Sequence, residues 1–254
     1  MAPADRRGAA IVTGASYGIG AASALALARK GFDVAVSDLT VETLAETVAA
    51  IRNFGRRAFA VALDLRSTDG IASAFSEVTR ACGPVDVLVN NAGVTLRGPA
   101  LEVTRAQWDE VIAVNATGTF FMCQQMGRHL IGAGRPGAII SIASTYAVVG
   151  QPGQAAYGVT KAAVSQMTRM LAIEWAAHGV RVNAVAPGRT DTPSPARQAS
   201  ARDPVRREQA LARIPMRRFG KSEEIGGLVA YLASPQASYI TGQTILIDGG
   251  LTAW

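Results

Sequence analysis

Short apolar runs alternate with longer stretches of helical periodicity along the whole chain. The short runs are apolar at consecutive positions, which is typical of strands that are buried on both faces of a parallel sheet. We expect such strands at residues 9–14, 32–38, 57–64, 85–93, 137–144, 180–188 and 244–250. We expect helices between them, at residues 18–30, 41–55, 68–81, 104–132, 154–178 and 222–233.

This alternation of strands and helices predicts an α/β fold. Because no linker or internal repeat interrupts the pattern, we expect residues 1–254 to form a single doubly wound Rossmann-type domain. Its parallel sheet should have about seven strands, with helices on both faces.

Composition narrows the class of protein. Hydrophobic residues make up 49% of the chain and charged residues 17%, which indicates a well-packed globular protein. The net charge is +6, but the basic residues are scattered, so no nucleic-acid partner is expected. No apolar window approaches the roughly 18 residues of a membrane span, and no signal peptide is evident, so we expect a cytoplasmic protein without a membrane partner. Cys82 and Cys123 lack metal-ligand spacing, so we expect two buried free thiols and no metal site.

The segment TGASYGIG, residues 13–20, lies between the first expected strand and the first expected helix. Gly14, Gly18 and Gly20 let the backbone turn sharply and approach a pyrophosphate, and the following helix offers its N-terminal N–H groups to that anion. The alternative is a glycine-rich turn without a ligand. The position of the loop directly after the first strand favours a nucleotide site.

Two aspartates end the next two expected strands. Asp38 can accept hydrogen bonds from both hydroxyls of an adenosine ribose and repel a 2′-phosphate, which predicts NAD rather than NADP as the cofactor. Its alternative role is a cap for the next helix, which Thr40 could serve equally well. Asp64 can accept a hydrogen bond from the adenine amine, and its alternative role is also a helix cap.

Tyr157 and Lys161 lie four residues apart in a small, apolar, helix-forming stretch, so they share one helix face. A tyrosine hydroxyl has a pKa of about 10 and is a poor base at neutral pH. A cation about 4 Å away is worth roughly 4 kcal/mol at an effective dielectric constant near 20, which lowers a phenol pKa by roughly three units. The pair can therefore exchange a proton with a substrate, whereas the alternative is a solvated pair on a helix surface.

Taken in order, these motifs resemble those of the short-chain dehydrogenase/reductase family over nearly the whole chain. TGASYGIG resembles the family's TGxxxGxG loop, NNAG at 90–93 its fourth-strand motif, and YGVTK its YxxxK motif. Pro187 and Gly188 followed by Thr192 resemble the segment that closes over the nicotinamide. The resemblance implies NAD-dependent hydride transfer between nicotinamide and a secondary alcohol or its ketone. It implies four catalytic residues, which are Asn115, Ser144, Tyr157 and Lys161.

The resemblance also assigns roles to these residues. Tyr157 exchanges the proton, Ser144 orients the substrate oxygen, and Lys161 also bonds the nicotinamide ribose. Asn115 holds a water in a proton relay with Lys161. A strand-end serine and a helix asparagine are common, so Ser144 and Asn115 depend on the other motifs. The residues expected to bind NAD are Gly14, Ser16, Tyr17, Gly18, Ile19, Gly20, Asp38, Asp64, Leu65, Asn91, Ala92, Gly93, Tyr157, Lys161, Pro187, Gly188, Thr190 and Thr192.

Residues 189–218 are expected to form a mobile lid over the substrate, because they hold four prolines and show little apolar periodicity. They also hold eight arginines against three acidic residues. A guanidinium suits a carboxylate or a phosphate, which favours an anionic small-molecule substrate. The alternative is a solvated face of an arginine-rich protein. We expect the substrate to contact Ser144, Gln151 and Arg189.

Several substrate classes stay open. The family includes dehydrogenases of polyols, sugars, sugar acids, hydroxysteroids and secondary alcohols, and acyl-carrier ketoreductases. The ending DGGLTAW resembles some polyol and sugar dehydrogenases, so a polyol, sugar or sugar acid is our first expectation. A 3-oxoacyl-thioester reductase is the alternative enzyme, although many of those use NADPH and carry Arg where this chain has Ile173. A non-catalytic nucleotide-binding regulator is the alternative from another class, and it would not need the four catalytic residues.

Helix 154–178 carries two apolar stripes. The stripe that should face the site and the sheet comprises Tyr157, Lys161, Val164, Thr168, Leu171 and Trp175. The second stripe comprises Ala163, Met167, Met170 and Ile173. A helix that is apolar on more than one side is buried on more than one side. Helices at this position form a dimer interface in the family, commonly within a tetramer, so we expect a homotetramer built as a dimer of dimers. Burial against the protein's own helices is the alternative.

Overall fold

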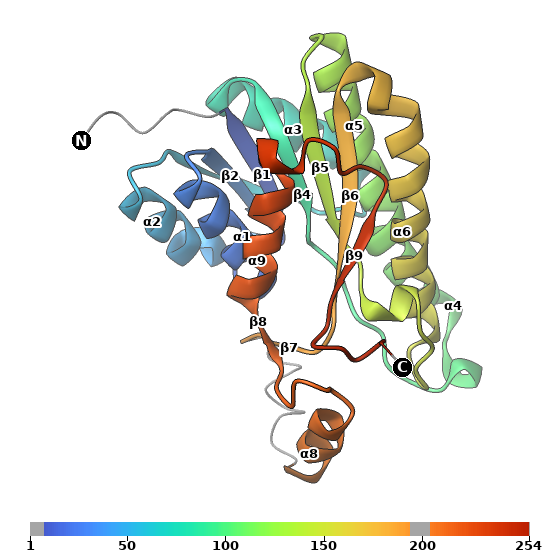
Figure 1. The fold of residues 1–254 in the computed structure, drawn as a ribbon. Coiled ribbons are helices and arrows are strands. Elements are labelled where there is room, and N and C mark those ends of the chain that lie inside the picture. Colours follow the sequence, from blue (N-terminus) through green and yellow to red (C-terminus); the bar gives the residue numbers. More distant parts are fainter. Residues whose placement is uncertain (1–7, 194–203, 254) are drawn as a thin grey trace.

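The computed structural model describes residues 8–193 and 204–253. Its centre is a seven-stranded sheet in which all strands run parallel, in the order β3-β2-β1-β4-β5-β6-β9 (Figure 1). This is the doubly wound α/β fold that the hydrophobic pattern predicts. The strands are β1 (Ala9–Thr13), β2 (Asp33–Asp38), β3 (Ala58–Ala62), β4 (Val85–Asn90), β5 (Gly137–Ile142), β6 (Val180–Pro187) and β9 (Thr244–Ile247).

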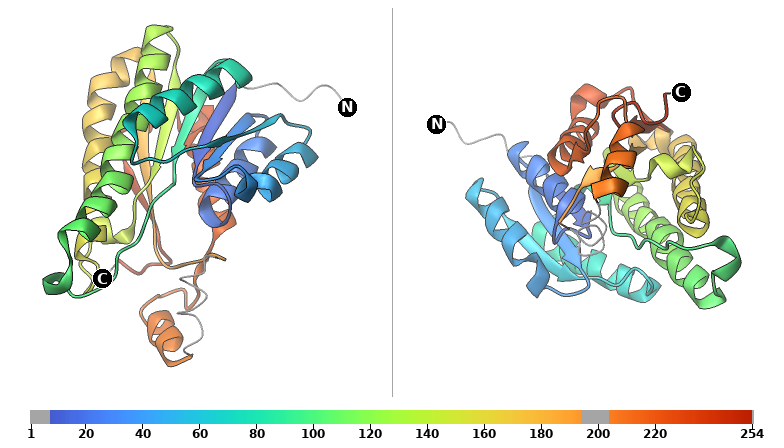
Figure 2. Two further views of the ribbon diagram at one scale, coloured as in Figure 1. Left: turned by 180° about the vertical axis from the view of Figure 1, so that it is seen from behind. Right: turned by 90° about the horizontal axis from the view of Figure 1, so that it is seen from below.

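Helices cover both faces of this sheet (Figure 2). One face packs against α1, α2 and α9 through side chains such as Leu27, Ile51 and Val229. The other packs against α3, α5 and α6 through Met126 and Leu171, among others. Apolar cores therefore form on both sides of the strands, as the continuous apolar runs predict. The helices named here are α1 (Gly18–Arg29), α2 (Ala45–Asn53), α3 (Thr68–Cys82), α5 (Thr119–Gly132), α6 (Ala155–Trp175) and α9 (Ser222–Leu232).

The strand order reverses beside β1. From β1 the chain moves outward through β2 and β3, and it then returns to β4 on the other side of β1. Ligands of open α/β sheets bind at such switch points, in the crevice at the carboxyl ends of the strands. The fold therefore places the loops that follow β1 and β4, at residues 14–17 and 91–104, beside one another at the candidate site.

The long helix expected at 104–132 is present as a continuous helical stretch from Arg105 to Gly132, but it is not α-helical throughout. The structure has α4 (Arg105–Ile112), a π-helical turn (Ala113–Gly118) and α5. Gly118 lies against Leu65, where an added Cβ would come within 2.6 Å of the Leu65 carbonyl oxygen. The wider turn accommodates this contact and holds Asn115, and π-helical turns inside α-helices are frequent at functional sites.

The other expected helices needed smaller corrections. The one at 41–55 opens as a 3₁₀ turn (Glu42–Leu44) before α2, and the one at 154–178 closes as a 3₁₀ turn (Ala176–His178) after α6. The inward stripe of α6 is confirmed, because Lys161, Val164, Thr168 and Leu171 are buried. The residues of the second stripe differ in how far they are buried. The side chains of Met170 and Ile173 are 53% and 78% exposed, whereas Met167 packs against the core.

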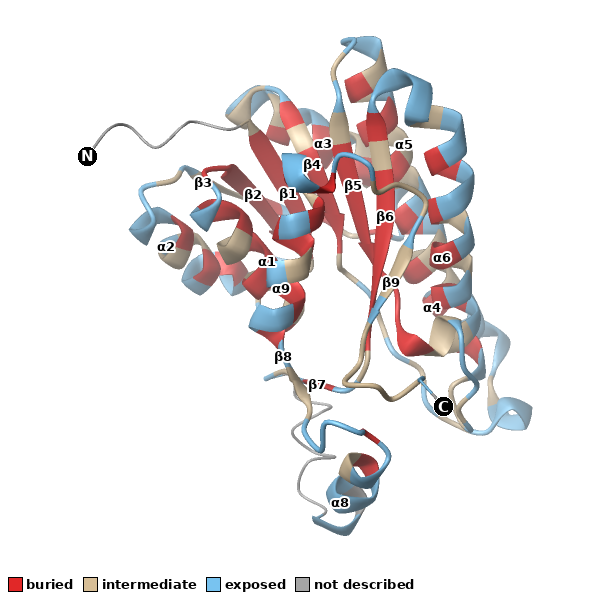
Figure 3. Cartoon of the chain, viewed as in Figure 1, coloured by how far each residue is buried: buried red, intermediate tan, exposed pale blue. Residues whose placement is uncertain are grey.

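The segment expected to be a lid contains regular structure. It includes the helix α8 (Pro204–Ala212), and Ala210 and Ile214 are buried, so the expectation that it lacks a packed element is wrong here. Its ends are joined by a pair of short parallel strands, β7 (Thr190–Asp191) and β8 (Gly220–Lys221). Figure 3 shows α8 mostly exposed beyond the carboxyl ends of the sheet strands. Residues 194–203, with Arg197 and Arg202, lie outside the described residues.

The two cysteines are both free thiols, but only one is buried. Cys123 is 1% exposed, and burial raises the pKa of its thiol to about 12, which makes it unreactive. Cys82 is partly exposed at the end of α3, so the expectation of two buried thiols is wrong for this residue. None of the helices in the described part of the chain is long and apolar enough to cross a membrane.

Candidate active site

The loop after β1 has the form of an anion cradle. Gly14 and Gly18 adopt positive φ angles of 63° and 61°, which glycine reaches without strain. A Cβ at Gly14 would come within 2.7 Å of the Ala92 Cα, and one at Gly20 would overlap the Gly14 carbonyl oxygen. Among the described residues, no side chain caps α1 and its first turn contains no acidic residue. The N–H groups of this turn can therefore receive a pyrophosphate, so the loop fits a dinucleotide.

The NNAG segment holds this loop in place. Asn91 Nδ2 donates to the carbonyl oxygens of Thr13 and Gly14, at 3.0 and 2.7 Å. In return, Thr13 Oγ1 accepts from the backbone N–H groups of Asn91 and Ala92, at 3.0 and 3.1 Å. The side chain of Asn91 therefore binds the phosphate loop itself, and the contact with the cofactor stays a prediction.

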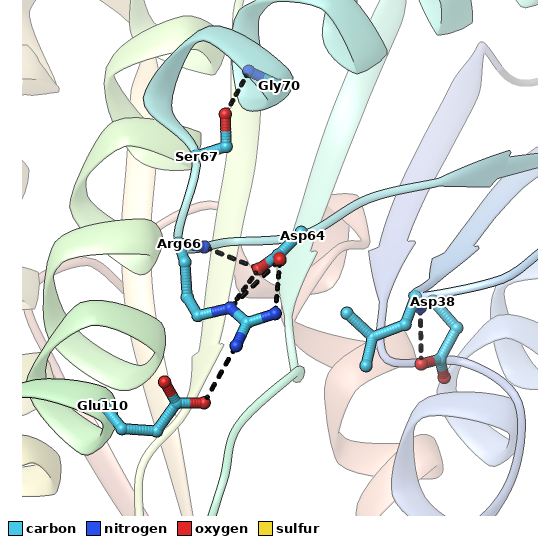
Figure 4. A network of polar contacts seen from close by, with 7 residues as sticks. Asp38, Asp64, Arg66, Ser67, Gly70 and Glu110 are labelled. Atoms are coloured by element: carbon cyan, nitrogen blue, oxygen red, sulfur yellow. Dashed lines mark hydrogen bonds and ion pairs between the residues drawn. The ribbon is translucent and has the colours of Figure 1, made fainter. Parts of the chain in front are cut away.

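Asp38 lies at the carboxyl end of β2, next to the same loop. Its Oδ2 accepts a hydrogen bond from Ser16 Oγ at 2.5 Å, and its Oδ1 accepts from the Leu39 N–H at 2.8 Å, the bond drawn in Figure 4. The 3₁₀ turn that follows has Val41 at its N-cap and no side-chain cap. Asp38 is therefore not a helix cap, and two of the residues predicted to bind the cofactor, Ser16 and Asp38, lie in contact.

Asp64 is bound by an arginine that sequence reasoning missed (Figure 4). The side chain of Arg66 donates to both Asp64 oxygens, at distances from 2.6 to 3.0 Å, and its backbone N–H donates at 2.9 Å. These hydrogen bonds hold the pKa of Asp64 below its ordinary value. Arg66 also lies 3.5 Å from Glu110 on α4. The cap of α3 is Ser67, which accepts from the Gly70 N–H, so the cap alternative for Asp64 is wrong.

Three of the four expected catalytic side chains meet at the end of β5. Ser144 follows this strand, is 8% exposed, and its Oγ accepts from the Tyr146 N–H at 3.2 Å. Tyr157 lies in the first turn of α6, and its ring packs edge-on against the ring of Tyr146. Lys161 lies one turn later, where its Nζ donates to the Ile142 carbonyl oxygen at 2.7 Å and lies 5.7 Å from the centre of the Tyr157 ring.

Lys161 is a buried ammonium. Its side chain is only 5% exposed, and burial lowers its pKa from 10.5 to about 8. An ammonium has three N–H groups, so Lys161 can donate to Ile142 and to ribose hydroxyls together. Gly93 lies beside it, because a Cβ there would come within 3.6 Å of Nζ. Gly93 and Lys161 are therefore neighbours, and their contact with a ribose stays a prediction.

Asn115 is buried in the π-helical turn and joins three segments. Its Oδ1 accepts from the Val94 N–H, and its Nδ2 donates to the Val94 carbonyl oxygen, both at 2.8 Å. Its Nδ2 also donates to Thr160 Oγ1 at 3.1 Å, and Thr160 in turn donates to the Tyr157 carbonyl oxygen. The side chain thus fixes α6 against the loop after β4. A water relay through Asn115 stays a prediction.

The segment after β6 reaches the phosphate loop. A Cβ at Gly18 would come within 3.3 Å of the Thr192 side chain, and one at Gly188 within 2.8 Å of the Asp248 Cα. Thr190 is buried and donates to the Gly188 carbonyl oxygen. Residues 187–192 therefore close one side of the crevice. Of the other predicted contacts, Leu65 is buried in the core on the α3 side of the sheet, Ile19 packs against the core on the α1 side, and Tyr17 is 49% exposed.

A cavity of about 890 Å³ adjoins the catalytic side chains. It is lined by Ser144 and Tyr157, by the two predicted substrate contacts Gln151 and Arg189, and by Gly188, Thr190 and Thr192. The structure therefore brings the catalytic group and the segment after β6 together around one space. Arg207 and Arg213, two arginines of the segment expected to be a lid, also line it, and so does Arg97, which no expectation included. No sequence motif marks these three positions.

The chain was compared with known proteins. The profile of the family described as enoyl-(acyl carrier protein) reductase matches residues 14–252, which is nearly the whole chain. The chain belongs to the short-chain dehydrogenase/reductase family. It is 35% identical to the gluconate 5-dehydrogenase of Gluconobacter oxydans (strain 621H), over 96% of this chain and 94% of the relative. It is 41% identical to the 3-oxoacyl-[acyl-carrier-protein] reductase FabG of Staphylococcus aureus (strain Mu50 / ATCC 700699), over 95% and 97%.

A solved structure of the same family is that of a gluconate 5-dehydrogenase from Burkholderia cenocepacia J2315 in complex with NADP and tartrate. It superimposes with a TM-score of 0.92 at 31% identity, and the match covers 98% of this chain and 97% of the other. Similarity of this extent establishes an oxidoreductase of the short-chain dehydrogenase/reductase family that uses a nicotinamide cofactor. It leaves two questions to be argued from the site, which are the choice of NAD or NADP and the substrate.

Proposed function

We propose that the protein is an NAD(H)-dependent oxidoreductase that interconverts a secondary alcohol and a ketone, with a sugar acid as substrate. The observation that carries the proposal is the cavity of about 890 Å³, in which Ser144 and Tyr157 face a lining with four arginines. Hydroxyl groups and guanidinium groups are suited to a polyhydroxylated, anionic molecule. The gluconate 5-dehydrogenases among the relatives act on such a molecule, and one is solved with tartrate, a dicarboxylate.

The chemistry divides between the cofactor and the chain. The nicotinamide, when bound, accepts or supplies the hydride. Ser144 accepts a bond from Tyr146 and still has a proton to donate, so it can orient the substrate oxygen. Tyr157 removes the alcohol proton in oxidation and returns it in reduction, as a general base and acid. Lys161 provides the nearby cation that favours the ionised phenol.

The preference for NAD rests on Asp38. A carboxylate has acceptor positions for about four hydrogen bonds, and Ser16 and Leu39 use two. The remaining positions suit the two hydroxyls of an adenosine ribose, whereas a 2′-phosphate would meet a fixed negative charge. The NADP in the gluconate 5-dehydrogenase structure belongs to that protein, so a direct comparison of the two cofactors is needed here.

The second candidate is a 3-oxoacyl-thioester reductase. The 41% identity with the FabG of Staphylococcus aureus favours it. The arginines that line the cavity argue against this candidate, because a fatty-acyl chain is apolar. Many such reductases carry Arg at the position of Ile173. In this chain Ile173 lies on α6, is 78% exposed and lines neither the substrate cavity nor the core. A non-catalytic regulator is disfavoured, since Ser144 and Tyr157 line one cavity and Lys161 lies beside the Tyr157 ring.

We also propose that the protein is a homo-oligomer, a dimer of dimers, in the cytoplasm. The outward face of α6 supports this, since Met170 and Ile173 are large apolar side chains with 53% and 78% exposure. Phe120 on α5 is 38% exposed as well. Light scattering after size exclusion measures the assembly directly, and a monomer at micromolar concentration contradicts this part of the proposal.

The function is tested with purified protein, NAD or NADP, and a panel of alcohols followed by nicotinamide absorbance. The panel pairs sugar acids with neutral polyols of the same chain length and includes a 3-oxoacyl thioester for the reverse reaction. We expect the highest kcat/KM with NAD and a sugar acid. Preferred turnover of the thioester with NADPH establishes the second candidate, and no turnover of any compound supports a regulator.

A further inference from the structure

The arginines around the cavity differ in what they already bind. Four of them line it, and Asp191 is the one carboxylate among the described lining residues. Arg207 lies next to Asp191, with 3.9 Å between Nη1 and Oδ1, and its guanidinium stacks 4.8 Å above the Phe219 ring. Arg207 is therefore partly neutralised. Arg189 lines this cavity and also a second one of about 130 Å³ that contains Glu224 and Asp248.

Arg213 lies at the end of α8 and lines the cavity near the loop that leads to Tyr157. It follows the helix directly, and its Nη1 donates to Gln151 Oε1 at 3.2 Å. Gln151 lies in the loop that leads into α6 and thus to Tyr157. A guanidinium has five N–H groups, so the bond to Gln151 fixes its position and leaves others for a ligand.

Arg97 lines the cavity from the segment after β4. The neighbouring Gly98 N–H donates to the Gly153 carbonyl oxygen at 3.1 Å, which ties the segment after β4 to the loop with Gln151. Both Arg97 and Arg213 are exposed to the cavity. Within the described part of the chain, no carboxylate lies within ion-pair distance of either one. By contrast, Arg218 of the same segment is bound to Glu224 at 2.7 Å and does not line this cavity.

We propose that Arg213, held by Gln151, and Arg97 form a carboxylate subsite that selects sugar acids over neutral polyols. This inference rests on the proposed function, and it moves the anion contact from Arg189, the first expectation, to two arginines that line the same cavity. A planar guanidinium fork matches the two oxygens of a carboxylate. The hydroxyl-bearing carbon chain then extends toward Ser144 and Tyr157, which line the same cavity.

The test compares Arg213→Gln and Arg97→Gln with the wild-type enzyme on D-gluconate and on the neutral polyol D-glucitol. Loss of a hydrogen bond to a charged group corresponds to roughly a tenfold to hundredfold loss of affinity. We expect KM for D-gluconate to rise by this factor, with little change in kcat and none in KM for D-glucitol. Gln151→Met should raise the same KM by a smaller factor, because it frees the Arg213 side chain. Arg217→Gln is the matched control. It removes the same charge from the same segment, and Arg217 lines neither cavity.

A second measurement separates the subsite from the choice of substrate. Tartrate is tested as a competitive inhibitor of the oxidation of a neutral secondary alcohol, and Arg213→Gln should weaken its inhibition while Arg217→Gln leaves it unchanged. If the wild type oxidises D-gluconate and neither Gln variant alters KM or inhibition, the subsite is wrong and the proposed function stands. An equal rise of KM for acid and polyol shows a structural role and also overturns the subsite. If the wild type neither oxidises D-gluconate nor binds tartrate, both the subsite and the sugar-acid substrate are wrong.

Discussion

At the switch point of the sheet, Thr13, Asn91 and Asp38 bind neighbouring residues through short hydrogen bonds, whereas Arg97, Arg189 and Arg213 are exposed on loops around the cavity. The first set fixes the backbone that receives the cofactor. The second set leaves donor groups free to meet a substrate. Backbone held in this way changes little among relatives, but exposed loop side chains can change without loss of the fold. We therefore expect the first region to determine how the cofactor binds and the second to select the substrate.

The largest effect is expected where the two regions meet, at Tyr157. Tyr157→Phe removes the hydroxyl but keeps the ring, which packs edge-on against Tyr146. Because general acid–base catalysis contributes about 10² to 10⁴-fold, kcat should fall by this factor. The affinity for NADH, measured by fluorescence titration, should be unchanged. Tyr231→Phe on α9 makes the same chemical change away from the site and should keep full activity. Near-normal turnover of Tyr157→Phe contradicts the mechanism.

The buried ammonium of Lys161 makes the stability of the enzyme depend on pH. Burial lowers its pKa from 10.5 to about 8 in the folded protein, so between these values the unfolded chain binds the proton more tightly. The free energy of unfolding should therefore rise with pH across this window, by about 3 kcal/mol in total. The cost is fully present below pH 8 and is relieved above 10.5.

Lys161→Met removes this titrating group. Urea unfolding of the two cofactor-free proteins is measured at several pH values. The free energy of unfolding of the wild type is then subtracted from that of the variant, so that the contributions of the other titrating groups cancel. We expect this difference to shrink as the pH rises from 7 to 10.5. A difference that stays constant across the range shows that Lys161 has the same pKa in both states.

The close packing of the phosphate loop can be tested directly at Gly20. A Cβ there would overlap the Gly14 carbonyl oxygen and come within 2.5 Å of Asn91 Nδ2. Because overpacking costs about 1–3 kcal/mol, Gly20→Ala should lower the thermal midpoint and weaken NADH binding. Gly132→Ala, at the end of α5 with open space around the added methyl group, should instead stabilise by about 0.5–1 kcal/mol. Similar midpoints for the two variants contradict the close packing of the phosphate loop.

The smallest expected effect concerns cofactor choice. Asp38→Ala removes the carboxylate that Ser16 and Leu39 hold. The ratio of kcat/KM for NAD to that for NADP should fall by roughly tenfold, which corresponds to about 1.4 kcal/mol. Steady-state kinetics with both cofactors measures it. A wild-type preference for NADP, or a ratio that does not change in Asp38→Ala, shows that Asp38 does not select the cofactor.

The sequence predicted the strands and the loops at the switch point well, because the signals for them are local. The apolar runs indicated the strands, and Gly14, Gly18 and Asp38 stand at fixed distances from them. The π-helical turn around Asn115 was missed, since its pattern continues that of α4 and α5, and its close approach to Leu65 is a contact between residues distant in the sequence. Arg66 was missed as well, because its hold on Asp64 depends on the conformation of a loop.

The sequence could not show which arginines face the substrate. Arg97, Gln151 and Arg213 come from three distant segments, and the fold places all three in the lining of one cavity. Charge count alone gave Arg218 the same weight as Arg213, yet Arg218 is bound to Glu224. Side chains without a motif acquire a function through tertiary contacts, and such contacts are not visible in residue order.

The central claim is that this site transfers a hydride between nicotinamide and a sugar acid, and isotope transfer tests it most directly. The enzyme is incubated with NADH that carries deuterium at both C4 positions and a keto sugar acid such as 5-keto-D-gluconate, and the product is analysed by mass spectrometry. We expect one deuterium on the carbinol carbon of each product molecule, formed at a rate that Tyr157→Phe lowers by about 10² to 10⁴-fold. Reduced product without deuterium, or no consumption of NADH with any keto sugar acid, would contradict the claim.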